Sequence, residues 1–184
     1  MILADADLDV AVERCVAGRL VNSGQSCIAA KRFIVEESVH TRFVDGGVAA
    51  MRTKRAAHPL EAGADLGPLA QAKTRERVHK QVRRSISAAA DCVLGGEVPS
   101  SAGFFYPPTV LTGVRPGMPA FDEEVFGPVA AIVAARISEM TGRELTADAL
   151  YAFTAPSKGE HDIGIVRFMA FVRATGAPWL WDLL

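Results

Sequence analysis

The sequence predicts an α/β fold, because stretches with helical periodicity alternate with short apolar stretches that are typical of buried strands. Apolar side chains recur at helical spacing over residues 8–20, 39–51 and 71–90. Short runs rich in apolar and β-branched residues predict strands at 33–35, 92–94 and 130–135. At 184 residues, the chain is long enough for one domain with a full hydrophobic core.

The composition is that of an ordinary globular protein. Apolar residues make up 49% and charged residues 22% of the chain, and the net charge of -1 gives no general attraction for nucleic acid or anionic membranes. The sequence has no run of about 18 apolar residues, which a membrane-spanning helix would need. It also shows no secretory signal pattern. The three cysteines are odd in number and show no paired spacing, so we expect a reducing, cytoplasmic location.

Two of the helical segments carry features that could be functional or structural. Asp5 or Asp7 can cap the first helix, and Cys15 falls on its apolar stripe, where a structural role is the favoured interpretation. The segment 71–90 is rich in Lys and Arg, which makes nucleic-acid binding an alternative. A solvated helix face is favoured, because no aromatic residue interleaves and an inward apolar stripe remains. The four histidines are too isolated to predict a metal site.

Two adjacent prolines mark the stretch 104–111, which reads FFYPPTVL. Pro107 and Pro108 lack a backbone N–H, so they exclude a helix and cannot donate to a sheet ladder. The stretch therefore predicts an edge strand or the approach to a strand.

The stretch 19–33, RLVNSGQSCIAAKRF, presents Cys27 between the end of a helix and the start of a strand. Asn22, Gly24 and Gln25 predict a turn, and a glycine there lets the backbone approach another segment closely. A thiolate attacks carbonyl carbons well, so a cysteine on such a turn is a candidate nucleophile. A buried structural cysteine is the alternative, because free cysteine is among the most buried residue types.

Three motifs in combination resemble the aldehyde dehydrogenase superfamily. The first is NSGQSC at 22–27, and the longer stretch GQSCIAAKRFIVEE is most similar to the succinate-semialdehyde dehydrogenase branch. The others are YPPTVL at 106–111 and EEVFGPV at 123–129, and ADLGPLA at 64–70 also resembles the family. The resemblance is nearly continuous from residue 2 to about residue 135, and it implies an open, mostly parallel sheet flanked by helices.

The resemblance also implies a chemistry. In this family a cysteine thiolate attacks an aldehyde, hydride passes from the thiohemiacetal to NAD or NADP, and water hydrolyses the thioester. The chain is thereby expected to be an oxidoreductase of a small aldehyde such as succinate semialdehyde, with Cys27 as nucleophile. Glu124 matches the glutamate that binds the nicotinamide ribose hydroxyls, and Phe126 matches the aromatic residue beside the nicotinamide. As alternatives, Glu124 is a solvated surface charge and Phe126 a core residue.

The resemblance changes past Arg136, where an apparent deletion near 136–140 joins two parts of the family's catalytic domain. Residues 142–145, GREL, resemble the segment before its last strand, so we expect a partial catalytic domain over residues 1–154. Residues 155–184 form an unrecognised apolar tail. A helix packed on the body is its favoured interpretation; contact with a membrane surface and a recombined terminus are the alternatives.

The 184 residues contain no counterpart of the glycine-rich dinucleotide-binding domain that precedes this segment in the family. The family's deacylating glutamate and oxyanion-hole asparagine precede it too, so we expect the isolated chain to be an impaired enzyme. The alternative is a non-catalytic binding or oligomerisation module. The expected partners are a small aldehyde and either a second copy of the chain or a complementing chain with a Rossmann domain.

Overall fold

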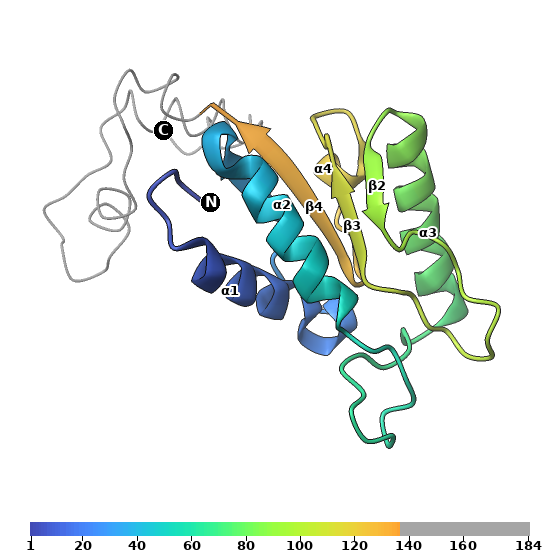
Figure 1. Ribbon diagram of the computed structural model, residues 1–184. Coiled ribbons are helices and arrows are strands. Elements are labelled where there is room, and N and C mark those ends of the chain that lie inside the picture. Colours follow the sequence, from blue (N-terminus) through green and yellow to red (C-terminus); the bar gives the residue numbers. More distant parts are fainter. Residues whose placement is uncertain (137–184) are drawn as a thin grey trace, which may run out of the picture.

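The computed structural model describes residues 1–136, and its centre is a four-stranded sheet with the order β1-β4-β3-β2 (Figure 1). β1 (Arg32–Glu36), β4 (Val129–Ala135) and β3 (Thr109–Thr112) run parallel to one another. β2 (Asp91–Leu94) pairs antiparallel with β3 at one edge. The predicted open, mostly parallel sheet is thereby confirmed.

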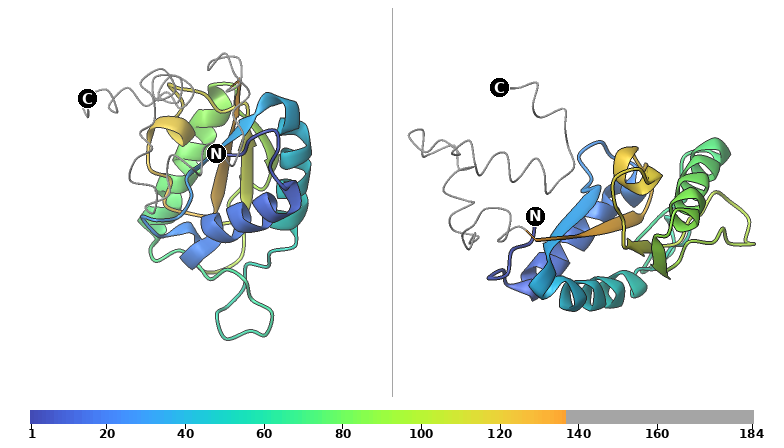
Figure 2. Two further views of the ribbon diagram at one scale, coloured as in Figure 1. Left: turned by 90° about the vertical axis from the view of Figure 1, so that its left-hand side faces the viewer. Right: turned by 90° about the horizontal axis from the view of Figure 1, so that it is seen from above.

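Helices cover both faces of this sheet (Figure 2). α1 (Leu8–Leu20) and α2 (Glu37–Arg52) lie on one face. α3 (Ala72–Ser87) and the short α4 (Pro119–Asp122) lie on the other. A 3₁₀ turn, η1 (Val21–Gly24), follows α1 and leads into the loop before β1.

The strand β4 supplies side chains to a hydrophobic core on each face. Ile132 packs with residues of α1 and α2, whereas Ala131 and Val133 pack with residues of α3 and α4. This alternation follows from the period of two in a strand. On the first face, Phe33 of β1 meets Phe43 of α2 edge to face, with ring centroids 5.9 Å apart.

The start of α1 confirms one of the two capping residues that the sequence offers. Oδ1 of Asp7 accepts hydrogen bonds from the N–H groups of Asp9 and Val10, at 3.1 and 3.2 Å. The predicted stripe is confirmed as well, since Val16 is buried and Cys15 is half-buried against the same core.

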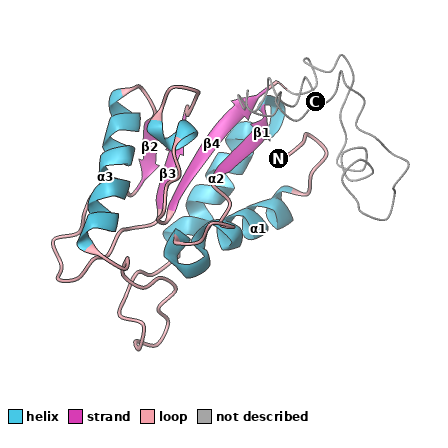
Figure 3. Cartoon of the chain, turned by 180° about the vertical axis from the view of Figure 1, so that it is seen from behind, coloured by secondary structure: helices cyan, strands magenta, loops and turns pink. Residues whose placement is uncertain are grey.

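The place of β3 corrects part of the expectation for the proline stretch. β3 is not an edge strand: it lies between β4 and β2, and all four of its residues are buried (Figure 3). Pro107 and Pro108 occupy the approach, so their missing N–H groups remove no bond from the ladder. The pairing begins at Thr109, whose N–H donates to the carbonyl of Pro128 at 2.9 Å.

The basic face of α3 agrees with the favoured interpretation of a solvated helix surface. Arg83 pairs with Glu97 at 3.1 Å and Arg84 with Glu123 at 3.1 Å. The side chains of Arg83, Arg84 and Glu97 are largely exposed, and that of Glu123 is half-buried. Acidic residues thus lie among the basic ones on this face.

No helix within residues 1–136 is long and apolar enough to cross a membrane. Over the same residues, no three or more His, Cys, Asp or Glu side chains gather where a metal ion could bind. The GREL segment and the tail at 155–184 lie outside the described residues.

Candidate active site

The candidate site is built around the loop that joins α1 to β1 and carries Cys27. Asn22, Ser23 and Gly24 have positive φ angles of 50, 56 and 75° in succession. For Asn and Ser, this left-handed conformation costs about 1–2 kcal/mol each. Backbone strain of this kind persists only where the surrounding contacts hold it, and it is common at functional sites.

Close packing on two neighbouring segments holds the loop. A Cβ atom on Gly24 would lie 2.1 Å from the carbonyl oxygen of Gly127, so only glycine fits there. Oγ of Ser23 donates to the carbonyl of Gly67 at 3.1 Å, and the N–H of Ala70 donates to Oε1 of Gln25 at 2.8 Å. The three stretches at 22–27, 64–70 and 123–129 therefore meet, although they are far apart in the sequence.

The site lies at the end of the sheet where β1 and β4 begin, in the lower part of Figure 1. Arg32 pairs with Ala131 in the parallel ladder. The loop before Arg32 and the turn before Val129 are therefore neighbours, which brings the Cys27 loop beside the segment that carries Glu124 and Phe126.

A buried arginine lies beneath the Cys27 loop. Arg19 is 1% exposed, and its guanidinium donates from Nη2 to the carbonyl of Gly24 at 2.8 Å and from Nη1 to the carbonyl of Ala30 at 3.0 Å. Burial lowers the pKa of Arg19 to about 10, and the charge of Glu124 opposes that shift. The guanidinium is therefore still a cation at neutral pH, and it joins the two ends of the loop.

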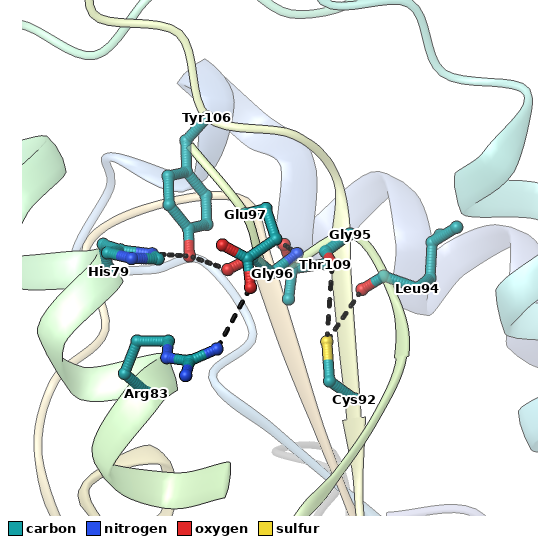
Figure 4. Close-up of polar contacts among 9 residues, drawn as sticks. All are labelled: His79, Arg83, Cys92, Leu94, Gly95, Gly96, Glu97, Tyr106 and Thr109. Atoms are coloured by element: carbon teal, nitrogen blue, oxygen red, sulfur yellow. Dashed lines mark hydrogen bonds and ion pairs between the residues drawn. The ribbon is translucent and has the colours of Figure 1, made fainter. Parts of the chain in front are cut away.

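Cys27 differs from the other two cysteines in exposure. Cys27 is exposed, whereas Cys15 and Cys92 are half-buried, and burial raises the pKa of both of these thiols. Sγ of Cys92 also faces the carbonyl oxygens of Leu94 and Gly95, at 3.4 and 3.6 Å (Figure 4). Among the three thiols, that of Cys27 is thus on the most exposed residue.

The tyrosine of the YPPTVL motif has a structural environment. The hydroxyl of Tyr106 is 3.3 Å from the carbonyl of Gly96 and 3.3 Å from Nδ1 of His79 (Figure 4). Oγ1 of Thr109 accepts a hydrogen bond from the N–H of Gly96 at 3.0 Å. Burial raises the pKa of Tyr106. These contacts fix the turn after β2 against the start of β3.

The two glutamates of the third motif are held differently. The carboxylate of Glu123 accepts hydrogen bonds from Gln81 at 2.8 Å and from Arg84 at 3.1 Å, and the bond from Gln81 is the main cause of its lowered pKa. The carboxylate of Glu124 accepts none from the residues that the structure describes. Only its backbone carbonyl is held, by Gln81 at 3.0 Å. Glu124 is therefore the carboxylate that remains available to a ligand.

Glu124 and Phe126 line a hollow of about 270 Å³ together with the first turns of α3. The other lining residues come from that helix and the residue before it: Gln71, Lys73, Thr74, Arg77 and Val78. Phe126 is half-buried, so its ring is partly accessible. The sequence analysis named Glu124 and Phe126 as candidates but missed the α3 residues that line the hollow with them. The sequence feature that could have indicated these residues was the basic face of the helix.

Two cations at the start of β1 converge on one carbonyl. Nζ of Lys31 and Nη1 of Arg32 donate to the carbonyl of Phe121, at 2.8 and 3.0 Å, and the guanidinium of Arg32 lies 4.7 Å from the centre of the Phe121 ring. Burial, followed by the like charge of Arg32, lowers the pKa of Lys31 to about 8. These contacts fix the start of β1 against α4, which leads directly to Glu124.

The fold and the motifs together are those of an α/β domain whose cysteine-bearing loop lies at the amino ends of the parallel strands. The chain belongs to the aldehyde dehydrogenase family, whose model matches residues 1–148. The resemblance that the sequence motifs carry is thereby confirmed.

Similar curated proteins are named as succinate-semialdehyde dehydrogenases. The Escherichia coli succinate semialdehyde dehydrogenase [NAD(P)+] Sad is 44% identical over 155 residues, which cover 84% of this chain and 33% of that protein. The Mycobacterium leprae succinate-semialdehyde dehydrogenase [NADP(+)] is 44% identical over 135 residues, covering 73% of this chain and 30% of that protein. The chain thus spans about a third of the length of these relatives.

Solved structures show the same family and fold. Lactaldehyde dehydrogenase from Escherichia coli matches with a TM-score of 0.73 at 29% identity, covering 95% of this chain and 36% of that one. The NAD+ complex of an aldehyde dehydrogenase from Bacillus cereus matches with a TM-score of 0.70 at 33% identity, covering 72% of this chain and 27% of that one.

Proposed function

We propose that this chain is the cysteine-bearing part of an NAD(P)-dependent aldehyde dehydrogenase that oxidises succinate semialdehyde or a related small aldehyde. One observation carries the proposal: the exposed Cys27 lies on a loop that packs, through Gly24 and Gly127, on the segment bearing Glu124 and Phe126. The names of the similar curated proteins support the substrate and the cofactor.

Cys27 is assigned the role of nucleophile. Its thiolate attacks the aldehyde carbon and forms a thiohemiacetal, while the carbonyl oxygen becomes an oxyanion. Within residues 1–136, the N–H of Cys27 donates to no protein acceptor, so it is available to that oxygen. One well-aimed donor of this kind contributes about 3–4 kcal/mol to stabilisation of the transition state.

Glu124 and Phe126 fit one end of a nicotinamide cofactor. A carboxylate without protein donors suits two ribose hydroxyls, and the partly accessible ring beside it offers an apolar face. When bound, NAD or NADP supplies the hydride acceptor. Glu124 and Phe126 would hold the ribose and the nicotinamide end of that cofactor, and Cys27 would carry the sulfur-bound substrate on the neighbouring loop.

The extent and the location of this unit are part of the proposal. We assign residues 1–154 to the partial catalytic domain and residues 155–184 to a separate tail; the family match at 1–148 supports this division. A cytoplasmic location is supported by three thiols that are all free in the described residues.

The proposal is tested by limited alkylation of the purified chain with iodoacetamide, followed by peptide mass mapping. We expect Cys27 to be labelled before Cys15 and Cys92, because the latter two are half-buried. Reaction with p-nitrophenyl acetate should release one burst of p-nitrophenol that Cys27→Ser abolishes and Cys15→Ser retains. Preferential labelling of Cys15 or Cys92 would show that Cys27 is not the nucleophile.

A second candidate is a non-catalytic binding or oligomerisation module. It is favoured by the small hollow beside Glu124 and Phe126, which measures about 270 Å³, less than the about 300–1,000 Å³ that is usual for ligand pockets. Light scattering on the purified chain, alone and with a separately produced Rossmann-domain chain, tests it. Assembly without any Cys27-dependent burst would favour this candidate over the enzyme.

A further inference from the structure

Arg19, in the last turn of α1, contacts the Cys27 loop but has no part in the chemistry proposed above. We propose that Arg19 is a positioning residue for acylation of Cys27, because its guanidinium fixes the loop through the carbonyls of Gly24 and Ala30. This inference rests on the proposed role of Cys27 as nucleophile. Within residues 1–136 the side chain of Arg19 is hydrogen-bonded to these two carbonyls and not to the sulfur of Cys27, so its proposed action is through the backbone of the loop.

The position of the guanidinium matches this task. Gly24 and Ala30 bracket Cys27, three residues away on either side, and each carbonyl receives one of the two terminal nitrogens of the same planar group. Between Gly24 and Ala30 the backbone has one internal hydrogen bond, from the N–H of Ala29 to the carbonyl of Ser26 at 3.1 Å. The rigid guanidinium fork sets the distance between the two ends, which a lysine ammonium cannot do with the same geometry.

The stability of the fold alone does not account for an arginine at this place. Burial of the cation is unfavourable, and within the described residues Nε of Arg19 has no hydrogen-bond partner. Replacing a buried charge by an apolar side chain of similar volume is often neutral or stabilising. Arg19 is buried and leaves one donor unpaired, yet it joins both ends of a strained loop. We therefore infer that its role is to position this loop in the candidate site.

Acylation and alkylation of Cys27 place different demands on the loop. Alkylation by iodoacetamide needs only a reachable thiolate. Acylation by p-nitrophenyl acetate also needs the N–H of Cys27 to point at the oxyanion that forms. The ratio of the two rate constants therefore reports the orientation of the loop separately from the accessibility of the sulfur.

The test compares Arg19→Met with the wild-type chain and with Arg14→Met, a matched change at an exposed arginine of the same helix. We expect Arg19→Met to lower the acylation rate constant by about 100-fold, the scale of a displacement of about 1 Å. The alkylation rate constant should stay near the wild-type value, and Arg14→Met should leave both unchanged. Circular dichroism and a urea titration of each variant report whether it folds.

Each outcome decides the proposal. An unchanged ratio in folded Arg19→Met, or an equal loss of both rates, would overturn the positioning role and leave the role of Cys27 intact. If the wild-type chain shows no Cys27-dependent burst, the proposed function fails and the positioning role fails with it. If Arg19→Met does not fold, Arg19→Lys is used instead, because it keeps the cation but not the guanidinium fork. We then expect a lower ratio of the acylation to the alkylation rate constant than in wild type. A wild-type ratio would refute the need for both contacts.

Discussion

Replacing Gly24 by alanine should break the contact that brings the two halves of the candidate site together. The new Cβ would lie 2.1 Å from the oxygen and 2.3 Å from the carbon of the Gly127 carbonyl, and 2.9 Å from the nitrogen of Pro128. All three are backbone atoms, so no side-chain rotation relieves the overlap. The positive φ of 75° adds about 1–2 kcal/mol for any residue with a Cβ.

Overpacking of this kind typically costs about 1–3 kcal/mol. The sum, about 2–5 kcal/mol, is a large part of the about 5–15 kcal/mol that stabilises a typical domain. Urea unfolding should show a lower midpoint with an unchanged slope. Gly47→Ala is the control: nothing lies within 4 Å of its Cβ in the interior of α2, so it should stabilise by about 0.5–1 kcal/mol. A Gly24→Ala chain as stable as wild type would refute the close approach of the two segments.

Two further predictions concern charged residues around the site. The pKa of Lys31 is about 8 in the folded chain, below the ordinary value of 10.5, so the unfolded chain binds more protons between these values. The free energy of unfolding of the wild-type chain should therefore rise, relative to that of Lys31→Met, as the pH increases from about 8 to 10.5. Urea titrations of both chains over this pH range measure the difference. A difference that does not vary with pH would contradict the prediction. Glu123→Ala should destabilise the chain by about 1 kcal/mol, because Gln81 and Arg84 lose a charged acceptor, whereas Glu124→Ala should change stability by less than about 0.5 kcal/mol. Equal losses for the two glutamates in urea unfolding would contradict their different surroundings.

Most of the fold could be predicted because its elements have clear periodicity. The apolar run in β4 is buried on both faces, and the stripe of α1 continues through Val12, Val16 and Leu20. α4 was missed because it has only four residues, too few to show a period. The central place of β3 could not be read from its sequence, because the prolines before it are equally compatible with an edge strand.

Site residues could be predicted only at positions that belong to one of the family motifs. Cys27, Glu124 and Phe126 were candidates because of the motifs around them, and the roles of these residues stay predictions. Arg19 was missed because a single charged residue near a helix end is usually solvated. Its two contacts depend on the left-handed turn at Asn22 and Ser23, whose backbone angles the residue types allow but do not require.

The purified 184-residue chain should acylate at Cys27 but should not produce NADH steadily from succinate semialdehyde. Acylation needs a nucleophile and an oxyanion donor, and the Cys27 loop offers both. Hydride transfer needs a bound dinucleotide, and the hollow beside Glu124 and Phe126 measures about 270 Å³, below the about 300–1,000 Å³ of pockets for ligands smaller than a dinucleotide.

A cofactor held only at its edge loses most of the advantage of proximity, which reaches about 7–11 kcal/mol in well-oriented reactions. Within residues 1–136 no side chain is hydrogen-bonded to Cys27, and hydrolysis of a thioester without a positioned base is slower by about 10²–10⁴-fold, so we expect no fast turnover after the p-nitrophenol burst. Absorbance at 340 nm under saturating NAD+ or NADP+ measures the first step, and the post-burst slope measures the second. Sustained NADH or NADPH formation that Cys27→Ser abolishes would show that these residues alone bind and orient the whole cofactor, contrary to the size of the hollow.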